Sequence, residues 1–302
     1  MKINFIANTK YWFGFSLILI LISAGAMLAN QISHGSLLKY SIDFTGGTIM
    51  DIQTPATKNR NELESVLKEY QAQISSSDNL NFTIKMKNID NETHQKLLSQ
   101  LKTSIGDFEE LKFETKGPSI GESMKKKAWI AIAITLVIIL GFITFAFREI
   151  PKELSAFRFG VAAMLALAHD VIITTGVFAL LGLFMGTEID ALFITAMLTV
   201  LGYSINDTIV VFDRVRENAR FARPSESFTE ICEKSIHQTI ARSFNTSFST
   251  LLPLLAIFFL GAPSVKVFVL ALIVGISIGT YSSIFIATPI ISFWYEIKKI
   301  SR

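Results

Sequence analysis

The chain has 302 residues, of which 50% are hydrophobic and only 18% are charged. This balance excludes an ordinary soluble domain and indicates a polytopic membrane protein with a modest water-exposed part. The formal net charge is +3, and the basic residues are scattered without an aromatic-basic stripe, which argues against nucleic-acid binding. The single cysteine, Cys232, excludes an intrachain disulfide, and no metal-ligand cluster is spelled out.

The first apolar segment runs from Tyr11 to about Ala29 and follows Lys2 and Lys10. The small residues around Ala24 would also fit the cleavage region of a signal peptide. A run of about 19 residues is long enough to cross a bilayer and long for the core of a signal peptide. We therefore expect an uncleaved membrane helix.

The polar region from Gly35 to Met124 is expected to form a separate α+β domain. Alternation of apolar and polar residues predicts three strands, and apolar residues near i, i+4 and i+7 predict two helices. The strands are 48–53, 81–86 and 111–114, and the helices are 61–70 and 93–105. A β-α-β-α-β layer of about 90 residues can bury a core of its own.

Five further apolar segments follow, so that six membrane spans are expected in total. The five are Ala128–Phe147, Phe159–Met185, Ala191–Phe212, Ile240–Gly261 and Val265–Tyr295. The expected division is therefore residues 1–34 with the first helix, 35–124 as the α+β domain, and 125–302 with helices two to six. The fold class is a polytopic α-helical membrane protein with one inserted α+β domain.

Basic residues gather in alternate connections between these spans. They are Arg148, Lys152, Arg158, Arg214, Arg216, Arg220, Arg223 and Lys234, with Lys298, Lys299 and Arg302 after the last span. The connections 186–190 and 261–264 contain no Lys or Arg. The positive-inside rule then places both termini in the cytoplasm and domain 35–124 outside. The run 125–127 of three lysines conflicts with this orientation, although long translocated domains largely escape the rule.

Asn206 and Asp207 interrupt the fourth expected span. Asp207 lies five residues before Phe212, where the apolar run stops. At about 1.5 Å per residue this is roughly 7–8 Å inside the hydrocarbon. An aspartate there costs about 2.5–3.5 kcal/mol on insertion scales, so it should face protein or water and have a partner.

Other polar residues within the spans allow structural as well as functional interpretations. His169 and Asp170 in the third span are either a polar pair that fixes helix register or part of a proton path. Arg242 lies near the start of the fifth span and could snorkel to the interface. It belongs to a polar stripe along one helical face: Thr239, Arg242, Ser243, Thr246, Ser249 and Thr250.

Two further patterns favour structural roles. Asp213, Arg214 and Arg216 lie where the fourth span ends and are most simply anchors of topology. The sixth span carries a small residue at every fourth position, which predicts close helix packing. These small residues are Ala271, Gly275, Gly279, Ser283 and Ala287.

Asp207 and Arg242 together suggest a mechanism. An aspartate can take up a proton, whereas an arginine stays charged in a protein. Separation of the two side chains would favour proton uptake by Asp207, and their approach would favour release. We therefore hypothesise that Asp207 carries protons and that Arg242 is its movable counter-charge.

Three motifs carry a resemblance to a known family. The stretch Gly202–Arg214 resembles the GYS-x-ND-x-x-VV-x-DR motif of the SecF-type members of the SecD/SecF family of protein-export subunits. The stretch Gly117–Gly121 is similar to the family's element before the second span. The DFTGG motif after the first span is matched by Asp43, Phe44, Thr45, Gly46 and Gly47. The resemblance covers nearly the whole chain and includes the regions of His169–Asp170 and Ala241–Ser243.

The resemblance implies an RND-like half-transporter with a periplasmic domain, in the bacterial inner membrane. Such chains pair with SecD, often with YajC and with YidC, and associate with the SecYEG channel. The pair uses proton-motive force to pull or release exported unfolded polypeptide, with protons as coupling ion and no other cofactor. The family's proton-coupling residues correspond to Asp207 and Arg242, beside Asn206. Ser243 follows Arg242 where many relatives have Thr, and either residue supplies a hydroxyl.

Two alternatives belong to other classes. A proton-coupled RND exporter of small molecules or lipids would share the spans and the intramembrane charges. It would normally carry two outer domains in one long chain, whereas this chain has one. An intramembrane enzyme is not expected, because the sequence has no His-Glu-x-x-His metal signature and no Gly-x-Ser-x-Gly nucleophile elbow.

Overall fold

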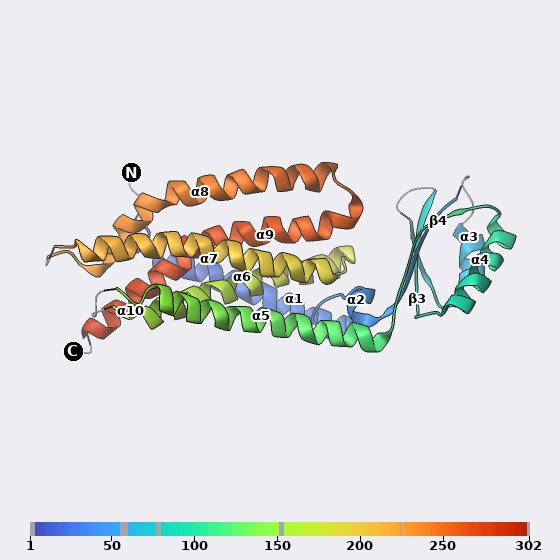
Figure 1. The fold of residues 1–302 in the computed structure, drawn as a ribbon, viewed down its shortest axis with the longest axis horizontal. Helices are drawn as coiled ribbons and strands as arrows, with labels where there is room; N and C mark the ends of the chain where they lie inside the picture. The colour runs from blue at the N-terminus through green and yellow to red at the C-terminus, as the bar shows by residue number, and fades with distance from the viewer. Residues whose placement is uncertain (1–3, 55–59, 77–79, 151–153, 224, 301–302) are drawn as a thin grey trace. The chain divides into compact units, whose positions relative to one another are not determined.

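The structure is a computed structural model that describes residues 4–54, 60–76, 80–150, 154–223 and 225–300 (Figure 1). The chain folds as two compact units, one of residues 1–39 and 130–302 and the other of residues 40–129. The first unit is helical, and the second contains the sheet. Lys152 and Arg302, on which the orientation prediction drew, lie outside the described residues, and the side-chain surroundings of Lys298 and Lys299 are not described.

Six long apolar helices occur among the described residues, as the sequence predicts, and they make up most of the first unit. Five are continuous: α1 (Thr9–His34), α5 (Pro118–Ala146), α6 (Ala156–Met185), α7 (Ala191–Arg220) and α8 (Phe228–Leu260). The sixth crossing consists of a 3₁₀ turn (Pro263–Val265), α9 (Lys266–Ser282), the π-helix η2 (Ser283–Ala287) and α10 (Thr288–Ile300). Helices α6, α7 and α9 pack against one another, and α1 packs along α6.

Helices α7 and α8 extend past the apolar runs that predict them. Helix α7 continues beyond Phe212 to Arg220, and α8 begins at Phe228, well before Ile240. A capping box explains the early start, because the Ser227 hydroxyl accepts from the Glu230 amide and the Glu230 carboxylate accepts from the Ser227 amide. An apolar run marks only the part of a helix that can lie in lipid, so it underestimates helices that project into water.

The second unit is a four-stranded antiparallel sheet with helices on one face. Its elements are α2 (Ile42–Thr45), β1 (Gly47–Gln53), α3 (Arg60–Leu67), β2 (Gln73–Ser76), β3 (Asn81–Met86), α4 (Asn91–Ile105) and β4 (Glu109–Lys116). The strand order is β2-β3-β1-β4. The core lies between the sheet and the pair α3 and α4, and it includes Met50, Ile52, Ile84, Leu97 and Leu101.

Strand β2 corrects the predicted order of elements. The observed order is β-α-β-β-α-β, because β2 pairs with β3 where no strand was expected. The sequence Gln73–Ser76 has one apolar residue, Ile74, so it carries no alternating pattern. The helix predicted to reach Tyr70 ends at Leu67, before a turn in which Gln71 has a φ of 51°.

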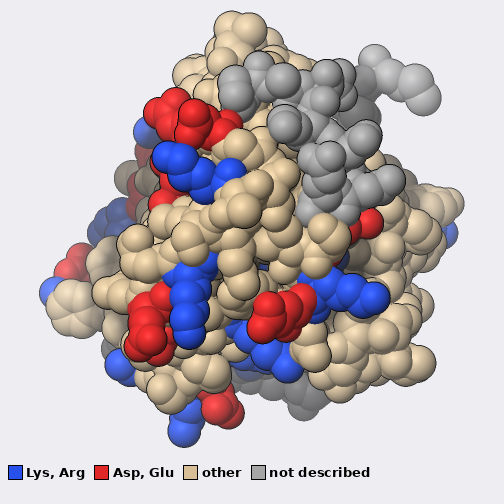
Figure 2. Space-filling model, turned by 90° about the vertical axis from the view of Figure 1, so that its right-hand side faces the viewer, with Lys and Arg blue, Asp and Glu red and all other residues tan. Residues whose placement is uncertain are grey.

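The helical face of this domain mixes charges of both signs. Figure 2 shows Lys and Arg interspersed with Asp and Glu over the described part of that face, without a patch of one sign. A polyanion such as nucleic acid would find no continuous positive surface there. This agrees with the scattered basic residues of the sequence.

Candidate functional site

Asp207 lies on the inward face of α7. Its side chain is only 5% exposed, and it shares that face with Ser204 and Val211, at helical spacing. Ser243 of α8, also buried, lies beside the carboxyl group and interacts with it. Among the described residues, Asp207 Oδ2 and Ser243 Oγ have no hydrogen-bond partner of normal geometry. A buried carboxylate oxygen without a donor is costly when charged, so this group is suited to hold a proton.

Arg242 and Asn206 lie on the outer side of the same two helices. Both side chains are exposed. Arg242 directly precedes Ser243, which lies beside the Asp207 carboxyl group. No ion pair joins the two side chains in the part of the chain that the structure describes. The structure therefore brings Asp207 together with Ser243, and leaves the expected counter-charge close by but outside.

The polar stripe of α8 divides in a similar way. Thr239 and Ser243 are buried, whereas Arg242, Thr246 and Ser249 are exposed. The partly buried Thr250 lies 3.3 Å from the hydroxyl of Tyr203 on α7. The stripe thus contributes two residues to the interior, and most of its other members face outwards.

Asp170 of α6 is fully buried, and both of its carboxylate oxygens have hydrogen-bond partners. Its Oδ1 atom lies 3.0 Å from Nδ1 of His169. Its Oδ2 atom accepts hydrogen bonds from Ser204 of α7 at 2.6 Å and from Ser282 of α9 at 2.8 Å. Since one carboxylate joins three helices, the network fixes how α6, α7 and α9 pack.

The network continues from His169 towards α1. Nε2 of His169 lies 3.1 Å from the hydroxyl of Ser16, which lies 3.1 Å from the hydroxyl of Tyr281. Tyr281 donates to the carbonyl oxygen of Trp12 at 3.0 Å. The π-helix η2 begins directly after Ser282, and such segments often occur at functional sites. Sequence reasoning missed Ser16, Tyr281, Ser204 and Ser282, because single hydroxyls are common in apolar helices.

The donor to the Asp170 carboxylate and the Asp207 carboxylate are neighbours along α7. Ser204, which donates to Asp170, precedes Asp207 by three residues, or about 4.5 Å along the helix axis. Ser247 of α8 and Thr280 of α9 are also buried and hydrogen-bonded to each other at this level. A polar layer thus crosses the helical unit between α6, α7, α8 and α9. In this layer Asp170 has partners for both oxygens and Asp207 does not.

The small residues of the sixth span lie at close helix contacts. Ala271, Gly275, Gly279, Ser283 and Ala287 are all buried. A Cβ atom at Gly279 would lie 2.8 Å from Cβ of Ser204, and one at Gly275 would overlap the side chain of Val200. These glycines allow α9 to approach the same face of α7 that carries Ser204 and Asp207.

The Asp-Phe-Thr-Gly-Gly motif, residues 43–47, lies in the second unit, where it contacts β4 and the start of α5. Asp43 pairs with Lys116 of β4, Phe44 is buried, and Thr45 donates to the carbonyl oxygen of Ser41. Gly46 has a φ of 72°, and a Cβ atom on it would lie 2.6 Å from Cα of Pro118. Gly47, with a φ of 131°, opens β1. The motif therefore packs backbone against backbone at the start of α5.

The charged residues at the end of α7 form exposed pairs. Arg214 pairs with Glu217 and donates to Gln238, and Arg216 pairs with Asp213 at 2.7 Å. The glutamate, glutamine and aspartate in these pairs are solvent-exposed. Groups of three or more His, Cys, Asp or Glu side chains that could hold a metal do not occur among the described residues.

Comparison with known proteins gives a consistent set of relatives. Residues 96–297 match the C-terminal family of protein export membrane proteins SecD/SecF. The protein translocase subunit SecF of Thermobaculum terrenum is 41% identical over 85% of this chain and 84% of its own length. SecF of Synechocystis is 33% identical over 97% of this chain and 95% of its own length.

Solved structures agree with these relatives. A crystal structure of SecDF from Thermus thermophilus, described as a translocon-associated membrane protein, is 36% identical over 98% of this chain, with a TM-score of 0.80. A second, in a super-membrane-facing form, has a TM-score of 0.70 at 35% identity. The chain spans about two fifths of these longer chains, 39% and 40% of their length.

Proposed function

The chain belongs to the SecD/SecF family of protein-export membrane proteins, and from this premise we propose that it is the SecF-type subunit of a bacterial protein translocase. In this role it promotes protein export together with a SecD partner. The relatives of nearly equal length that carry the name protein translocase subunit SecF support this function. The proposal assigns the chain no enzymatic reaction and no cofactor besides the proton. The exporter of small molecules or lipids has no support among these relatives.

A SecD-type chain is the proposed partner. The SecDF relative, whose name joins both subunits, matches this chain over 39% of its length. The exposed Arg242 and Asn206 support a partner as well, because a charge facing lipid on a transmembrane helix is costly. Association with SecYEG, YajC and YidC, and contact with exported unfolded polypeptide, are further parts of the proposal. They rest on the family resemblance of the sequence.

The proposed location is the inner membrane, with both termini in the cytoplasm and the α+β domain in the periplasm. The two ends of the described chain lie at the same end of the helical unit, on the left of Figure 1. The partly buried Arg214 and Arg216 lie at that end of α7, and the connection 186–190 at its other end has no Lys or Arg. This distribution of basic residues supports the orientation.

Asp207 is the proposed proton carrier. The observation that carries this assignment is a buried carboxylate whose Oδ2 atom, among the described residues, has the Ser243 hydroxyl beside it but no hydrogen bond of normal geometry. Approach of Arg242 would favour the charged carboxylate and so release the proton. Each proton that crosses the membrane supplies about 2.3 kcal/mol per 100 mV of potential. Such energy can drive a change in how the helices, and the domain they carry, are arranged.

Export into sealed inner-membrane vesicles tests the proposal. The vesicles contain the chain, its SecD-type partner and the channel, and export of a secreted substrate is measured with and without a proton gradient. We expect Asp207→Asn to abolish the gradient-dependent part at unchanged membrane abundance. Asp213→Asn, an exposed position on the same helix, is the matched control and should retain it. A gradient response that survives in Asp207→Asn would contradict the assignment.

A further inference from the structure

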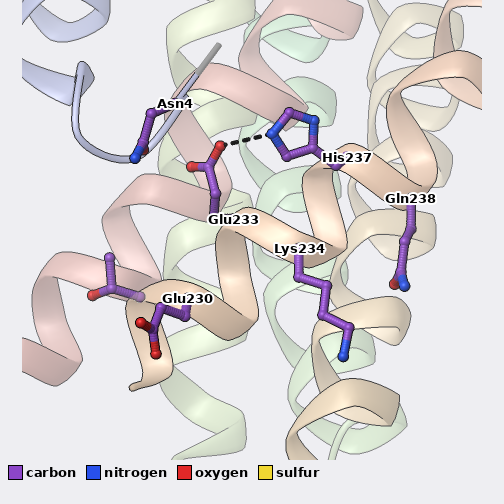
Figure 3. A pocket seen from close by; sticks show the side chains of 7 residues that line it. Asn4, Glu230, Glu233, Lys234, His237 and Gln238 are labelled. Carbon is purple, nitrogen blue, oxygen red and sulfur yellow. Dashed lines mark ion pairs between the residues drawn. The ribbon is translucent and has the colours of Figure 1, made fainter. Parts of the chain in front are cut away.

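The first described residues of the chain are attached to the beginning of α8. The backbone amides of Phe5 and Ile6 donate to the two carboxylate oxygens of Glu233, at 2.9 and 2.7 Å. In Figure 3 Asn4 and Glu233 lie next to each other at the edge of an open pocket of about 700 Å³. His237, one turn along α8, pairs with the same carboxylate at 3.1 Å.

Glu233 thereby acts as a clamp on the backbone of this segment. Hydrogen bonds to an ionised carboxylate are among the strong ones, and here one carboxylate accepts two. A third bond, from the indole nitrogen of Trp12 to the carbonyl oxygen of Phe5, measures 3.1 Å. These three bonds fix the backbone on both sides of the Phe5 side chain.

The Phe5 side chain is inserted into the helical unit. It is only 5% exposed and packs in a cluster with Val211 of α7, Ile236 of α8 and Ile284 of η2. Its ring lies 5.1 Å from that of His237 and 5.6 Å from that of Phe285, centroid to centroid. An aromatic ring supplied by the N-terminal segment thus fills the space between three helical crossings.

This cluster lies next to the polar layer that contains Asp207. Val211 follows Asp207 by four residues, and Ile284 follows Thr280 by four, which is about 6 Å along each helix. On α8, which runs the other way, Ile240 and Ile236 lie between Ser243 and Glu233. The buried hydroxyl of Thr239, which lies among them, donates to carbonyl oxygens of its own helix. All three crossings therefore place an apolar layer between Asp207 and the charged end of the helices.

We infer that Phe5 completes an apolar seal between Asp207 and the water at this end, and that Glu233 is the positioning residue that holds the seal closed. The inference rests on the proposed function, in which Asp207 exchanges protons across the membrane. A proton reaches a buried carboxylate through water or hydrogen-bonded groups, and a packed apolar layer supplies neither. Val211, Ile236 and Ile284 are fixed in helices, whereas Phe5 lies before the start of α1 and its backbone is held by Glu233 and Trp12. Phe5 is therefore the part of the seal that can move.

Access of a water-soluble reagent tests the seal directly. In the full complex, Cys232→Ser removes the native thiol and Ser243→Cys places a new one beside Asp207. A charged thiol reagent is added to inverted vesicles. We expect Phe5→Ala to speed labelling at least tenfold, a change of about 1.4 kcal/mol in the opening equilibrium. Phe5→Leu, which keeps an apolar side chain there, should label slowly, and Glu233→Gln, which loses the charge, should lie between.

Control positions separate opening from general loosening. Thr174 is buried in α6, so Thr174→Cys in the same background should stay unreactive in the Phe5→Ala protein. Equal labelling of Ser243→Cys with Phe5 and with Ala would overturn the inference. Labelling of Thr174→Cys together with Ser243→Cys would overturn it too, because Phe5 would then only stabilise the fold.

A second measurement connects the seal to Asp207. The decay of an imposed pH gradient across the same vesicles should be faster for Phe5→Ala, and adding Asp207→Asn should restore the slow decay. Fast decay that persists in the double variant would overturn the inference, because protons would then pass elsewhere. The labelling result does not depend on proton transfer. Failure of the proposed function, an Asp207→Asn complex with intact gradient-driven export, is therefore distinguishable from failure of the seal.

Discussion

Asp170 and Asp207 are two aspartates in neighbouring apolar helices with different surroundings. Asp170 accepts from Ser204 and Ser282 and lies against His169, so both of its oxygens have hydrogen-bond partners in place. Among the described residues, Asp207 has one oxygen without a hydrogen bond of normal geometry and one adjacent hydroxyl. A carboxylate with hydrogen-bond partners for both oxygens stabilises one arrangement of the helices. A carboxylate that lacks one of these partners changes its protonation more easily when its surroundings change. This contrast favours Asp207 as the carrier and a packing role for Asp170.

The Ser282→Ala variant distinguishes the two roles of the His169–Asp170 pair. Removal of one donor from a buried carboxylate should cost about 1–3 kcal/mol of stability. We expect a lower midpoint of thermal unfolding for the purified complex, and an unchanged gradient dependence of export per folded molecule. Ser277→Ala, at an exposed hydroxyl of the same helix, is the control. An unchanged midpoint with a lost gradient response would instead place Asp170 in the proton path.

At the scale of single residues, the sequence located the charged groups but not their partners. Asp207, His169 and Asp170 stand out because charged residues are rare in apolar runs. Ser16 and Tyr281 do not stand out, and only helix packing brings them to His169. The expected pairing of Asp207 with Arg242 stays a prediction, because the two side chains lie on different sides of the helices. Their approach would require a rotation or a rearranged neighbour.

At the scale of elements, the close contact between α7 and α9, here called the α7–α9 seam, depends on glycines that have no side chain. A Cβ atom at Gly275 would overlap the side chain of Val200, and one at Gly279 would meet Ser204. The sequence predicts this seam from the repeat of small residues. It does not show that α7 is the partner helix, since the repeat carries no information about the facing surface. For the same reason the sequence does not predict β2. Its residues show no alternation of apolar and polar side chains, so its pairing with β3 could not be foreseen.

Gly275→Ala tests the α7–α9 seam. Forcing a methyl group against Val200 should cost about 1–3 kcal/mol, because the packed helices must separate slightly. A matched change at Gly25 of α1, where a Cβ atom would meet nothing within 4 Å, should be neutral or slightly stabilising. Thermal unfolding of the two purified variants gives the comparison. Equal midpoints would show that the seam tolerates separation.

The ion-pair cluster at the end of β4 predicts a pH dependence for the small domain. Hydrogen bonds and charge from Lys116 and Lys112 lower the pKa of Glu114. Burial alone would lower the pKa of Lys116, but its hydrogen bonds to Asp43 and Glu114 outweigh this and raise it. Because the folded pKa of Glu114 lies below its unfolded value, its stabilisation is present above the unfolded pKa, near pH 4.3. It is lost as the pH falls further, through the folded pKa.

Hydrogen exchange of β4 amides in the full chain measures this effect. We expect protection to decrease between about pH 4.5 and pH 3 in the native protein, and this pH-dependent part to shrink in Glu114→Gln. The size should be modest, within the roughly 1 kcal/mol typical of partly exposed pairs. Glu69→Gln, at an exposed site on the other side of the domain core, is the control. Identical pH profiles for native chain and Glu114→Gln would contradict the assignment.

At the scale of the whole molecule, the helical unit has a packed interior, but polar side chains also remain exposed on its membrane-spanning helices. Its polar layer is enclosed by α6, α7, α8 and α9, while Arg242 and Asn206 remain exposed on α7 and α8. In a soluble protein such residues would simply be solvated. On helices that cross a membrane they face either lipid, at a cost, or another protein. The composition of the chain predicts the six spans, but only the folded arrangement shows which polar residues the chain satisfies by itself.

Arg242→Leu should therefore change the stability of the chain in opposite directions with and without its SecD-type partner. Alone, the chain loses a charge that has no ion-pair partner among the described residues, so its thermal midpoint should rise. In the complex, the same change removes a polar contact and the counter-charge of Asp207, so the midpoint should fall and gradient-driven export should be lost. A partner that binds only the folded chain adds about 2.7 kcal/mol at a concentration of 100 times Kd, which is large enough to measure. Lys234→Leu, at an exposed site near the start of α8, should shift both midpoints equally. If Arg242→Leu did so too, the exposed face of α7 and α8 would not be where the partner binds.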